Sequence, residues 1–145
     1  MSGTGARAVA IARGWIGTPY RHQASARGAG ADCLGLLRGV WRELYGAEPE
    51  VVPAYTQDWS EPEGAERLWQ AAARHLRSCD LRSGVRPGEV LLFRMRAGSV
   101  AKHLGLAAER GGRATFIHAY SGHGVVESPL STPWARRLVA RFEFP

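Results

Sequence analysis

The hydrophobic period of the sequence changes near its middle, and this change limits the folds that the chain can adopt. Before residue 80, apolar residues recur every three to four positions, which is typical of amphipathic helices. After residue 85, apolar residues form short segments separated by glycine, serine or proline, which is typical of strands. A chain of 145 residues with helices first and a meander of strands second is predicted to adopt an α+β fold.

Helices are predicted over residues 5–15, between Asp32 and Gly46, and over residues 62–78. Asp32 is a suitable N-cap, Gly46 a suitable C-terminal stop, and Pro62 would occupy the first turn of the last helix. Residues 47–60 show no clear period and are predicted to form an ordered loop. Strands are predicted over 88–95, 103–109, 114–120, 124–127 and 137–144. We expect one domain, helical over about residues 1–80 and sheet over about 86–145, with the second helix covering the sheet.

The second helix begins with a cysteine, Cys33. Its apolar stripe is predicted to contain Cys33, Leu37, Val40 and Leu44, widened by Leu36 and Trp41. The positive end of a helix dipole favours a thiolate, so this position suits a reactive cysteine. A buried structural cysteine is the alternative, because free cysteines are commonly buried.

Two histidines lie on predicted strands in the second half of the chain. His103 should share a strand face with Ala107, and His118 should share one with Phe116 and Tyr120. If those faces meet the start of the second helix, Cys33, His103 and His118 converge in an arrangement suited to nucleophilic acyl transfer. His103 would hold the Cys33 thiolate as an ion pair and later protonate the leaving amine, and His118 would orient His103. The pKa of Cys33 is then expected to lie below its usual value.

Each histidine also has a structural interpretation. His103 could be a polar residue at a strand edge, and His118 a hydrogen-bonded core histidine. His123, in an exposed turn, is a rival third member, and a zinc site made by these three histidines is a further alternative. Neither a C-x-x-C nor an H-E-x-x-H pattern supports zinc, so we expect no metal and no cofactor.

The remaining histidines and the second cysteine carry weaker signals. His22 and His75 are interpreted as loop and helix-surface residues. Cys79 ends a helix among polar residues and is interpreted as structural or incidental. Two cysteines make no disulfide framework, which favours a reducing compartment during synthesis.

The net charge of +6 is spread along the chain rather than gathered. Arg136 and Arg137 are the only adjacent basic pair, so specific nucleic-acid binding is not predicted, whereas general attraction to polyanions is compatible. No apolar run is long enough to span a membrane, and Arg7 and Arg13 interrupt the apolar start, so neither membrane insertion nor a secretory signal is expected.

Five sequence blocks occur in the order and spacing of the NlpC/P60 cysteine peptidases, which the chain resembles over roughly residues 5–143. The blocks are GTPYRHQ, ADCLGLLRGVW, RPGEVLLFRM, KHLGLAAE and ATFIHAYSGHGVVE. The D-C-L-G-L block with G-V-W, and a loop with Pro53, Tyr55, Asp58 and Trp59, resemble the phage-type branch found in tail gene clusters of phages and gene transfer agents.

The resemblance implies a papain-like fold and assigns roles to five residues. Cys33 matches the nucleophile, His103 the general base and His118 the third polar residue. Tyr20 matches a tyrosine of the oxyanion or substrate-contacting wall, and Asp32 an acid that recognises the free amine of the stem peptide. Many members have serine after the nucleophile, whereas this chain has Leu34, which puts a preference for a free N-terminal L-alanine in question.

The resemblance also implies a substrate, partners and a place of action. Family members cleave the bond between the γ-carboxyl of D-glutamate and a diamino acid in the peptidoglycan stem. A phage-type member would be made in the cytoplasm without a signal peptide and carried by tail, tail-hub or baseplate proteins to the cell wall. Tyr55 and Trp59 could dock it there, or could pin their loop onto the core. An N-acetylmuramoyl-L-alanine amidase and a non-catalytic tail component are the alternative functions.

Overall fold

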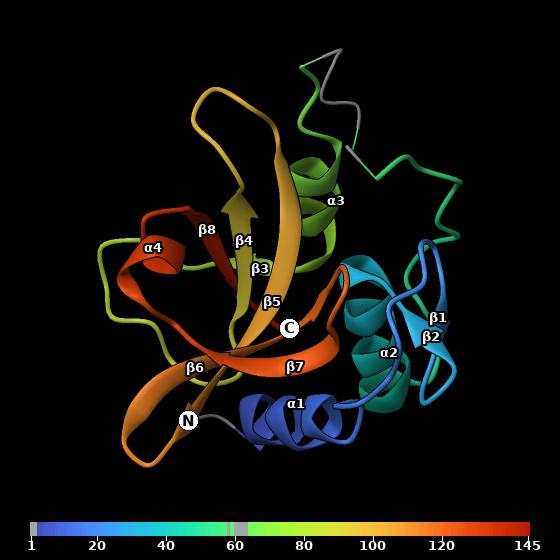
Figure 1. The fold of residues 1–145 in the computed structure, drawn as a ribbon, viewed down its shortest axis with the longest axis horizontal. Coiled ribbons are helices and arrows are strands. Elements are labelled where there is room, and N and C mark those ends of the chain that lie inside the picture. Colours follow the sequence, from blue (N-terminus) through green and yellow to red (C-terminus); the bar gives the residue numbers. More distant parts are fainter. Residues whose placement is uncertain (1–2, 58, 60–63) are drawn as a thin grey trace.

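A computed structural model describes residues 3–57, 59 and 64–145 (Figure 1). The helices are α1 (Gly3–Arg13), α2 (Cys33–Tyr45), α3 (Arg67–His75) and α4 (Thr132–Ala135). The strands are β1 (Ser25–Ala26), β2 (Gly30–Ala31), β3 (Arg77–Ser78), β4 (Val90–Arg94), β5 (Ala101–Arg110), β6 (Arg113–Tyr120), β7 (Gly124–Pro129) and β8 (Leu138–Glu143). Within the described residues, no helix has the length and apolar character needed to cross a membrane. The predicted α+β class is confirmed.

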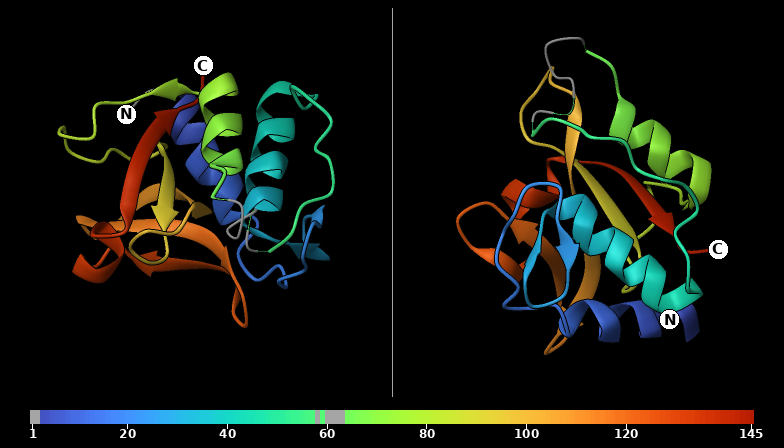
Figure 2. Two further views of the ribbon diagram at one scale, coloured as in Figure 1. Left: turned by 90° about the horizontal axis from the view of Figure 1, so that it is seen from above. Right: turned by 90° about the vertical axis from the view of Figure 1, so that its right-hand side faces the viewer.

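Six strands form one antiparallel sheet in the order β3-β8-β4-β5-β6-β7, and β1 and β2 form a separate hairpin. Strands β4 to β7 follow one another as the predicted meander. The last predicted strand does not continue it, because β8 returns to the other side of β4 and pairs with it. The meander prediction was therefore wrong for β8. Figures 1 and 2 show α1, α2 and α3 grouped beside the sheet and α4 lying away from them.

The two faces of the sheet bury separate apolar clusters. One face, with Leu104, Leu106 and Ile117, packs against α1, α2 and α3 in the main core. The other face buries a smaller cluster that Trp134 of α4 covers. Its buried members are Leu91, Phe93, Ala107 and Phe116. As predicted, α2 covers the sheet.

Helix α2 fits flush against its neighbours because two glycines, one turn apart, lie in its buried face. A Cβ atom at Gly35 would collide with the Ala24 carbonyl, and one at Gly39 would collide with the Trp15 ring. The fully buried side of α2 therefore runs through Cys33, Leu36 and Val40 with these glycines. The predicted stripe was placed too far round the helix, because Leu37 and Leu44 are only half-buried.

The predicted helix boundaries agree with the structure to different degrees. Asp32 caps α2, and Gly46 follows it with a positive φ of 92°, both as predicted. Helix α3 is shorter than the predicted 62–78, and the predicted role of Pro62 lies outside the described residues. Within residues 47–57 the described chain forms no helix or strand, as predicted for this loop.

Candidate active site

Cys33 is the first residue of α2, and the neighbouring Asp32 fixes the start of that helix. One carboxylate oxygen of Asp32 accepts a hydrogen bond from the Gly35 N–H at 2.7 Å, which caps the helix. The Cys33 thiol donates to the carbonyl oxygen of Lys102 at 3.7 Å. The thiol is therefore held between the N-terminus of α2 and the start of β5.

Strand β5 carries a bulge at the point where the thiol meets it. Phe93 of β4 pairs with His103, but the next residue, Arg94, pairs with Ala101, so Lys102 is an extra residue in the ladder. A bulge changes the alternation of side chains and is common beside active sites. Here it places Ala101 in the main core and His103 two residues later on the other face.

His103 and His118 form a hydrogen-bonded pair across neighbouring strands. The Nε2 atom of His103 lies 2.8 Å from the Nδ1 atom of His118, with the ring planes at 81°. The second nitrogen of His118, Nε2, lies 2.9 Å from the Ser128 hydroxyl of β7. The Trp134 ring contacts both imidazoles from α4.

The histidine face of the sheet does not pack against α2, contrary to the sequence-based expectation. It belongs to the side that Phe93, Phe116 and Trp134 cover, whereas α2 packs on the opposite side. Cys33 and His103 nevertheless line one cavity, and the thiol contacts Lys102, the residue directly before His103. The bulge at the start of β5, and not face-to-face packing, makes the connection.

A cavity of about 360 Å³ opens between these elements. Four of the five residues assigned from the resemblance line it, namely Tyr20, Asp32, Cys33 and His103. His118 does not line the cavity and instead contacts His103 from behind, which is the position of an orienting residue. The cavity therefore presents a thiol, an imidazole, a carboxylate and a phenol to one small volume.

Burial keeps the thiol and the imidazoles neutral. Burial, together with the Asp32 charge, raises the pKa of Cys33 to about 12, although nearby backbone N–H groups of Leu104, Leu34 and Cys33 itself oppose this rise. Burial and the neighbouring His118 lower the pKa of His103 to about 3. Burial and His123 lower the pKa of His118 to about 4. The expected thiolate–imidazolium pair is thus replaced by a neutral thiol beside a neutral base.

Asp32 is only 2% exposed and is fully engaged with its surroundings. Its second carboxylate oxygen accepts from the Gln23 N–H at 2.7 Å and from the Tyr55 hydroxyl at 2.5 Å. Tyr55 stacks on Trp59, which is itself only 9% exposed. Trp59 is therefore held against the core, which supports the alternative in which these aromatic side chains pin their loop, whereas docking of a partner through the half-buried Tyr55 stays a prediction.

Comparison with known proteins now identifies the family. A model of the NlpC/P60 family matches residues 17–142. The chain belongs to the NlpC/P60 family. No match was found among curated protein sequences.

Solved structures with the NlpC/P60 fold resemble this domain over nearly its whole length. The NlpC/p60 domain of the peptidoglycan hydrolase SagA is 25% identical, with a TM-score of 0.62, and the match covers 97% of this chain and 98% of that one. NlpC2 from Trichomonas vaginalis is 19% identical with a TM-score of 0.68, and an NlpC/P60 family protein from Bacillus cereus is 16% identical with a TM-score of 0.66. The match covers 99% and 97% of this chain but only 48% and 40% of those proteins.

Several residues around the NlpC/P60 site were not identified from the sequence. His22 lines the cavity, and its Nε2 atom lies 2.9 Å from the Tyr55 carbonyl oxygen, although its sequence context indicated a simple loop residue. Tyr120 also lines the cavity and stacks on His123, which is exposed as predicted. Ser128 contacts His118 because of the register in which β7 pairs with β6, and no local sequence motif indicates that register.

The alternative zinc site has no support in the described residues. No group of three or more histidine, cysteine, aspartate or glutamate side chains among them is arranged to hold a metal ion. Both ring nitrogens of His118 are hydrogen-bonded to protein side chains, one to His103 and the other to Ser128.

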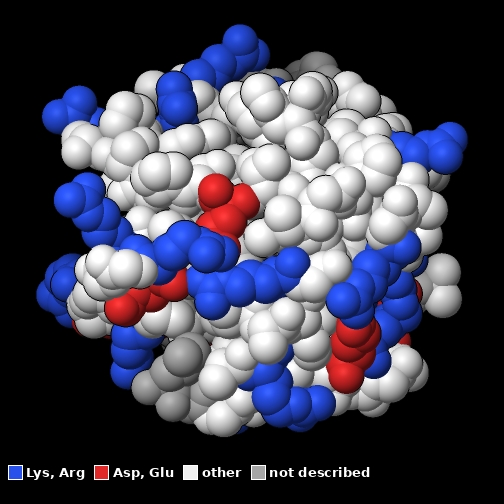
Figure 3. Space-filling view, turned by 60° about the horizontal axis from the view of Figure 1, so that its bottom comes forward, with Lys and Arg blue, Asp and Glu red and all other residues white. Residues whose placement is uncertain are grey.

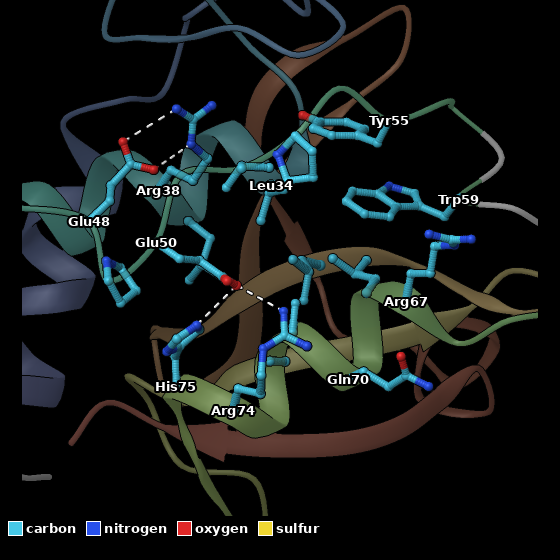
Figure 4. Close-up of a pocket in the computed structure, with 18 of the residues that line it drawn as sticks. Leu34, Arg38, Glu48, Glu50, Tyr55, Trp59, Arg67, Gln70, Arg74 and His75 are labelled. Carbon is cyan, nitrogen blue, oxygen red and sulfur yellow. Dashed lines mark hydrogen bonds and ion pairs between the residues drawn. The ribbon is translucent and has the colours of Figure 1, made fainter.

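A second, larger cavity lies beside the reactive one and has a volume of about 700 Å³ (Figure 4). Tyr55 and Trp59 line both cavities and form their shared wall. Leu34, the residue that replaces the more usual serine, lines the larger cavity and not the reactive one. The substitution therefore adds apolar surface next to the site.

Positive charge is spread over the surface of the domain, as the sequence predicted. On the face shown in Figure 3, lysine and arginine side chains lie in separate groups, some of them beside acidic residues. Arg13 and Arg110, for example, both pair with Glu127. Such pairing reduces the net field available for anionic partners.

Proposed function

We propose that this NlpC/P60 domain is a cysteine endopeptidase that hydrolyses an amide bond in the stem peptide of peptidoglycan. The observation that carries the proposal is the presence of Cys33 and His103 in the lining of one cavity, with His118 hydrogen-bonded to His103. The named activity of SagA, a peptidoglycan hydrolase with the same fold, supports the choice of substrate. The resemblance to NlpC/P60 cysteine peptidases favours the bond between the γ-carboxyl of D-glutamate and a diamino acid.

The first half of the reaction uses His103 as a general base. Its Nε2 atom is engaged with His118, so Nδ1 is the nitrogen that takes the Cys33 proton as the substrate binds. The sulfur then attacks the carbonyl carbon, and the carbonyl oxygen becomes an oxyanion. Backbone N–H groups at the N-terminus of α2 and the hydroxyl of Tyr20 are the groups that we assign to stabilise this charge.

The second half of the reaction releases both products. The imidazolium of His103 gives its proton to the leaving amine as the C–N bond breaks, which leaves a thioester on Cys33. A water molecule then attacks the thioester, His103 takes one proton from it, and the regenerated thiolate receives that proton. The net change is the addition of one water molecule across the amide bond.

Digestion of purified peptidoglycan, followed by mass spectrometry of the muropeptides, tests this function. The wild-type domain is expected to cut after D-glutamate, and Cys33→Ala is expected to lose all detectable turnover. Cys79→Ala is the matched control and should retain the wild-type rate. Release of the intact stem from muramic acid would instead identify an amidase, and binding without any cleavage would identify a non-catalytic component.

We further propose that the enzyme is carried on a phage-like or gene-transfer-agent tail. The support for this proposal is the resemblance of its D-C-L-G-L block and its Pro53–Trp59 loop to the phage-type branch. Held on a tail, the domain would work at a high local concentration over the wall without strong affinity of its own. Fractionation of particles should then recover the peptidase with tail-hub or baseplate proteins, and its recovery only as free protein would contradict this placement.

A further inference from the structure

Ser128 ends a chain of hydrogen bonds that starts at the catalytic cavity. His103 Nε2 lies 2.8 Å from His118 Nδ1, and His118 Nε2 lies 2.9 Å from the Ser128 hydroxyl. Ser128 pairs with Phe116 in the β6–β7 ladder, so it is the diagonal neighbour of His118 on the same face. The serine thus reaches the imidazole nitrogen that points away from the cavity.

The protons in this chain can be arranged in two ways. In the first, His103 Nε2–H donates to His118 Nδ1, and His118 Nε2–H donates to Ser128. In the second, both directions are reversed, and His103 then carries its proton on Nδ1. Only the first arrangement leaves a lone pair on His103 Nδ1 that can accept the Cys33 proton.

The reactive state requires the first arrangement. Once His103 holds the thiol proton, both of its ring nitrogens are donors, so His118 Nδ1 must accept. The proton of a neutral His118 must then lie on Nε2, and its partner there is the Ser128 hydroxyl. His118 is only 1% exposed, so loss of a partner for that N–H leaves a buried donor unsatisfied.

We infer that Ser128 is a positioning residue of the active site, whose hydroxyl accepts from His118 Nε2 and thereby holds His118 as the acceptor for His103. This inference rests on the proposed function for its kinetic consequence, but its structural content does not depend on the substrate. The expected role parallels that of an orienting carboxylate behind a catalytic histidine, with a neutral hydroxyl in its place.

Threonine and valine provide a matched pair of substitutions, because they have nearly the same shape and differ in the hydroxyl. Ser128→Thr is expected to keep kcat within about twofold of the wild type. Ser128→Val is expected to lower kcat about tenfold with little change in KM, because the lost hydrogen bond matters in the imidazolium state. Ser131→Ala, at an exposed serine outside the chain of hydrogen bonds, should leave both constants unchanged.

Nitrogen-15 NMR of histidine-labelled protein reads the tautomers directly, without any substrate. In the wild type and in Ser128→Thr, His118 is expected to carry its proton on Nε2, and in Ser128→Val a mixture of tautomers should appear. A wild-type His118 protonated on Nδ1, or a valine variant with unchanged tautomer and unchanged kcat, would overturn the inference. A wild-type protein without activity on muropeptides would refute the proposed function, while the NMR spectra would still decide the role of Ser128.

Discussion

The two cavities of this domain share a wall but differ in the state of their ionisable groups. The smaller, of about 360 Å³, contains Cys33 and His103, both kept neutral by burial. In the larger, of about 700 Å³, charged side chains neutralise each other (Figure 4). Glu48 pairs with Arg38 at 2.6 Å, and Glu50 pairs with Arg74 at 2.9 Å.

The volume of a cavity therefore does not by itself indicate which of the two carries the proposed catalysis. Hydrogen bonds from Arg38 and Arg74 lower the pKa values of Glu48 and Glu50, so these acids stay ionised and paired. A general base needs an unprotonated group whose lone pair is free to accept a proton. The smaller cavity meets that condition, and the larger one has the properties of an apolar recess beside it.

Removing one histidine from each cavity, His103 from the smaller and His75 from the larger, compares the functions of the two cavities. His103→Ala is expected to lower kcat at least about a thousandfold, because the proton acceptor is lost. His75→Ala, in the larger cavity, should change kcat less than about twofold. His118→Ala should leave a measurable remnant, since an orienting residue exchanges no proton with the substrate. Steady-state kinetics on a purified muropeptide measures all three, and an equal loss in the His75 variant would contradict the assignment.

Substitutions that fill each cavity with a large side chain are expected to give the next largest difference in activity. Ser121 lines the smaller cavity and Ala71 lines the larger one. Ser121→Trp is expected to lower kcat/KM at least about tenfold by excluding the substrate, whereas Ala71→Trp should leave it nearly unchanged. Thermal unfolding of both variants controls for loss of structure. A larger effect from the Ala71 variant would assign substrate binding to the larger cavity.

Acid should destabilise the domain through the buried histidine pair, His103 and His118. Their folded pKa values of about 3 for His103 and about 4 for His118 lie below the ordinary value of 6.5. Below pH 6.5 the unfolded chain therefore binds protons that the folded domain does not. The free energy of unfolding is expected to fall by up to about 1.4 kcal/mol per pH unit for each histidine as the pH decreases from 6.5.

Urea unfolding between about pH 6.5 and pH 5 measures this slope above the range in which carboxylates titrate. His103→Gln should remove roughly half of the slope, and His75→Gln should leave it unchanged. An identical slope in the wild type and in His103→Gln would show that burial does not hold His103 neutral.

A substitution at Tyr55, in the wall that the two cavities share, is expected to have the smallest effect on activity. Tyr55→Phe removes the hydroxyl that donates to Asp32. The same carboxylate oxygen keeps the Gln23 N–H, and His22 Nδ1 lies 3.7 Å from it. A substrate ammonium group could then approach Asp32 more easily. The ratio of kcat/KM for a stem peptide with a free amine to that for its N-acetylated form is expected to rise about threefold. An unchanged ratio would separate Asp32 from amine recognition.

The sequence predicted which segments form helices and strands better than it predicted which strands pair with each other. The periods identified α1, α2 and the long strands, because those signals extend over several turns or residues. The elements β1, β2, β3 and α4 are each two to four residues long, too short to show a period. The pairing of β8 with β4 is a contact between distant segments, and nothing in the composition of residues 137–144 specifies it.

The site shows the same division. The positions of Cys33, His103 and His118 followed from helix and strand patterns together with the resemblance. The bulge at Lys102 and the contact to Ser128 depend on strand register, which a single sequence does not reveal. The predicted lowering of the Cys33 pKa was wrong. The prediction considered the helix N-terminus, which favours the thiolate, but not the burial of the thiol, which raises its pKa.

The reactive groups also come from opposite halves of the chain, with the thiol at Cys33 on a helix and both imidazoles on strands after residue 100. The segment between β3 and β4 connects these halves and includes the exposed Leu81. A chain divided in that segment would yield one fragment with the proposed nucleophile and another with the proposed base, and we expect neither to hydrolyse an amide alone. Fused to two interacting proteins, such fragments would act as a sensor of proximity, with amide cleavage reporting that the halves have met.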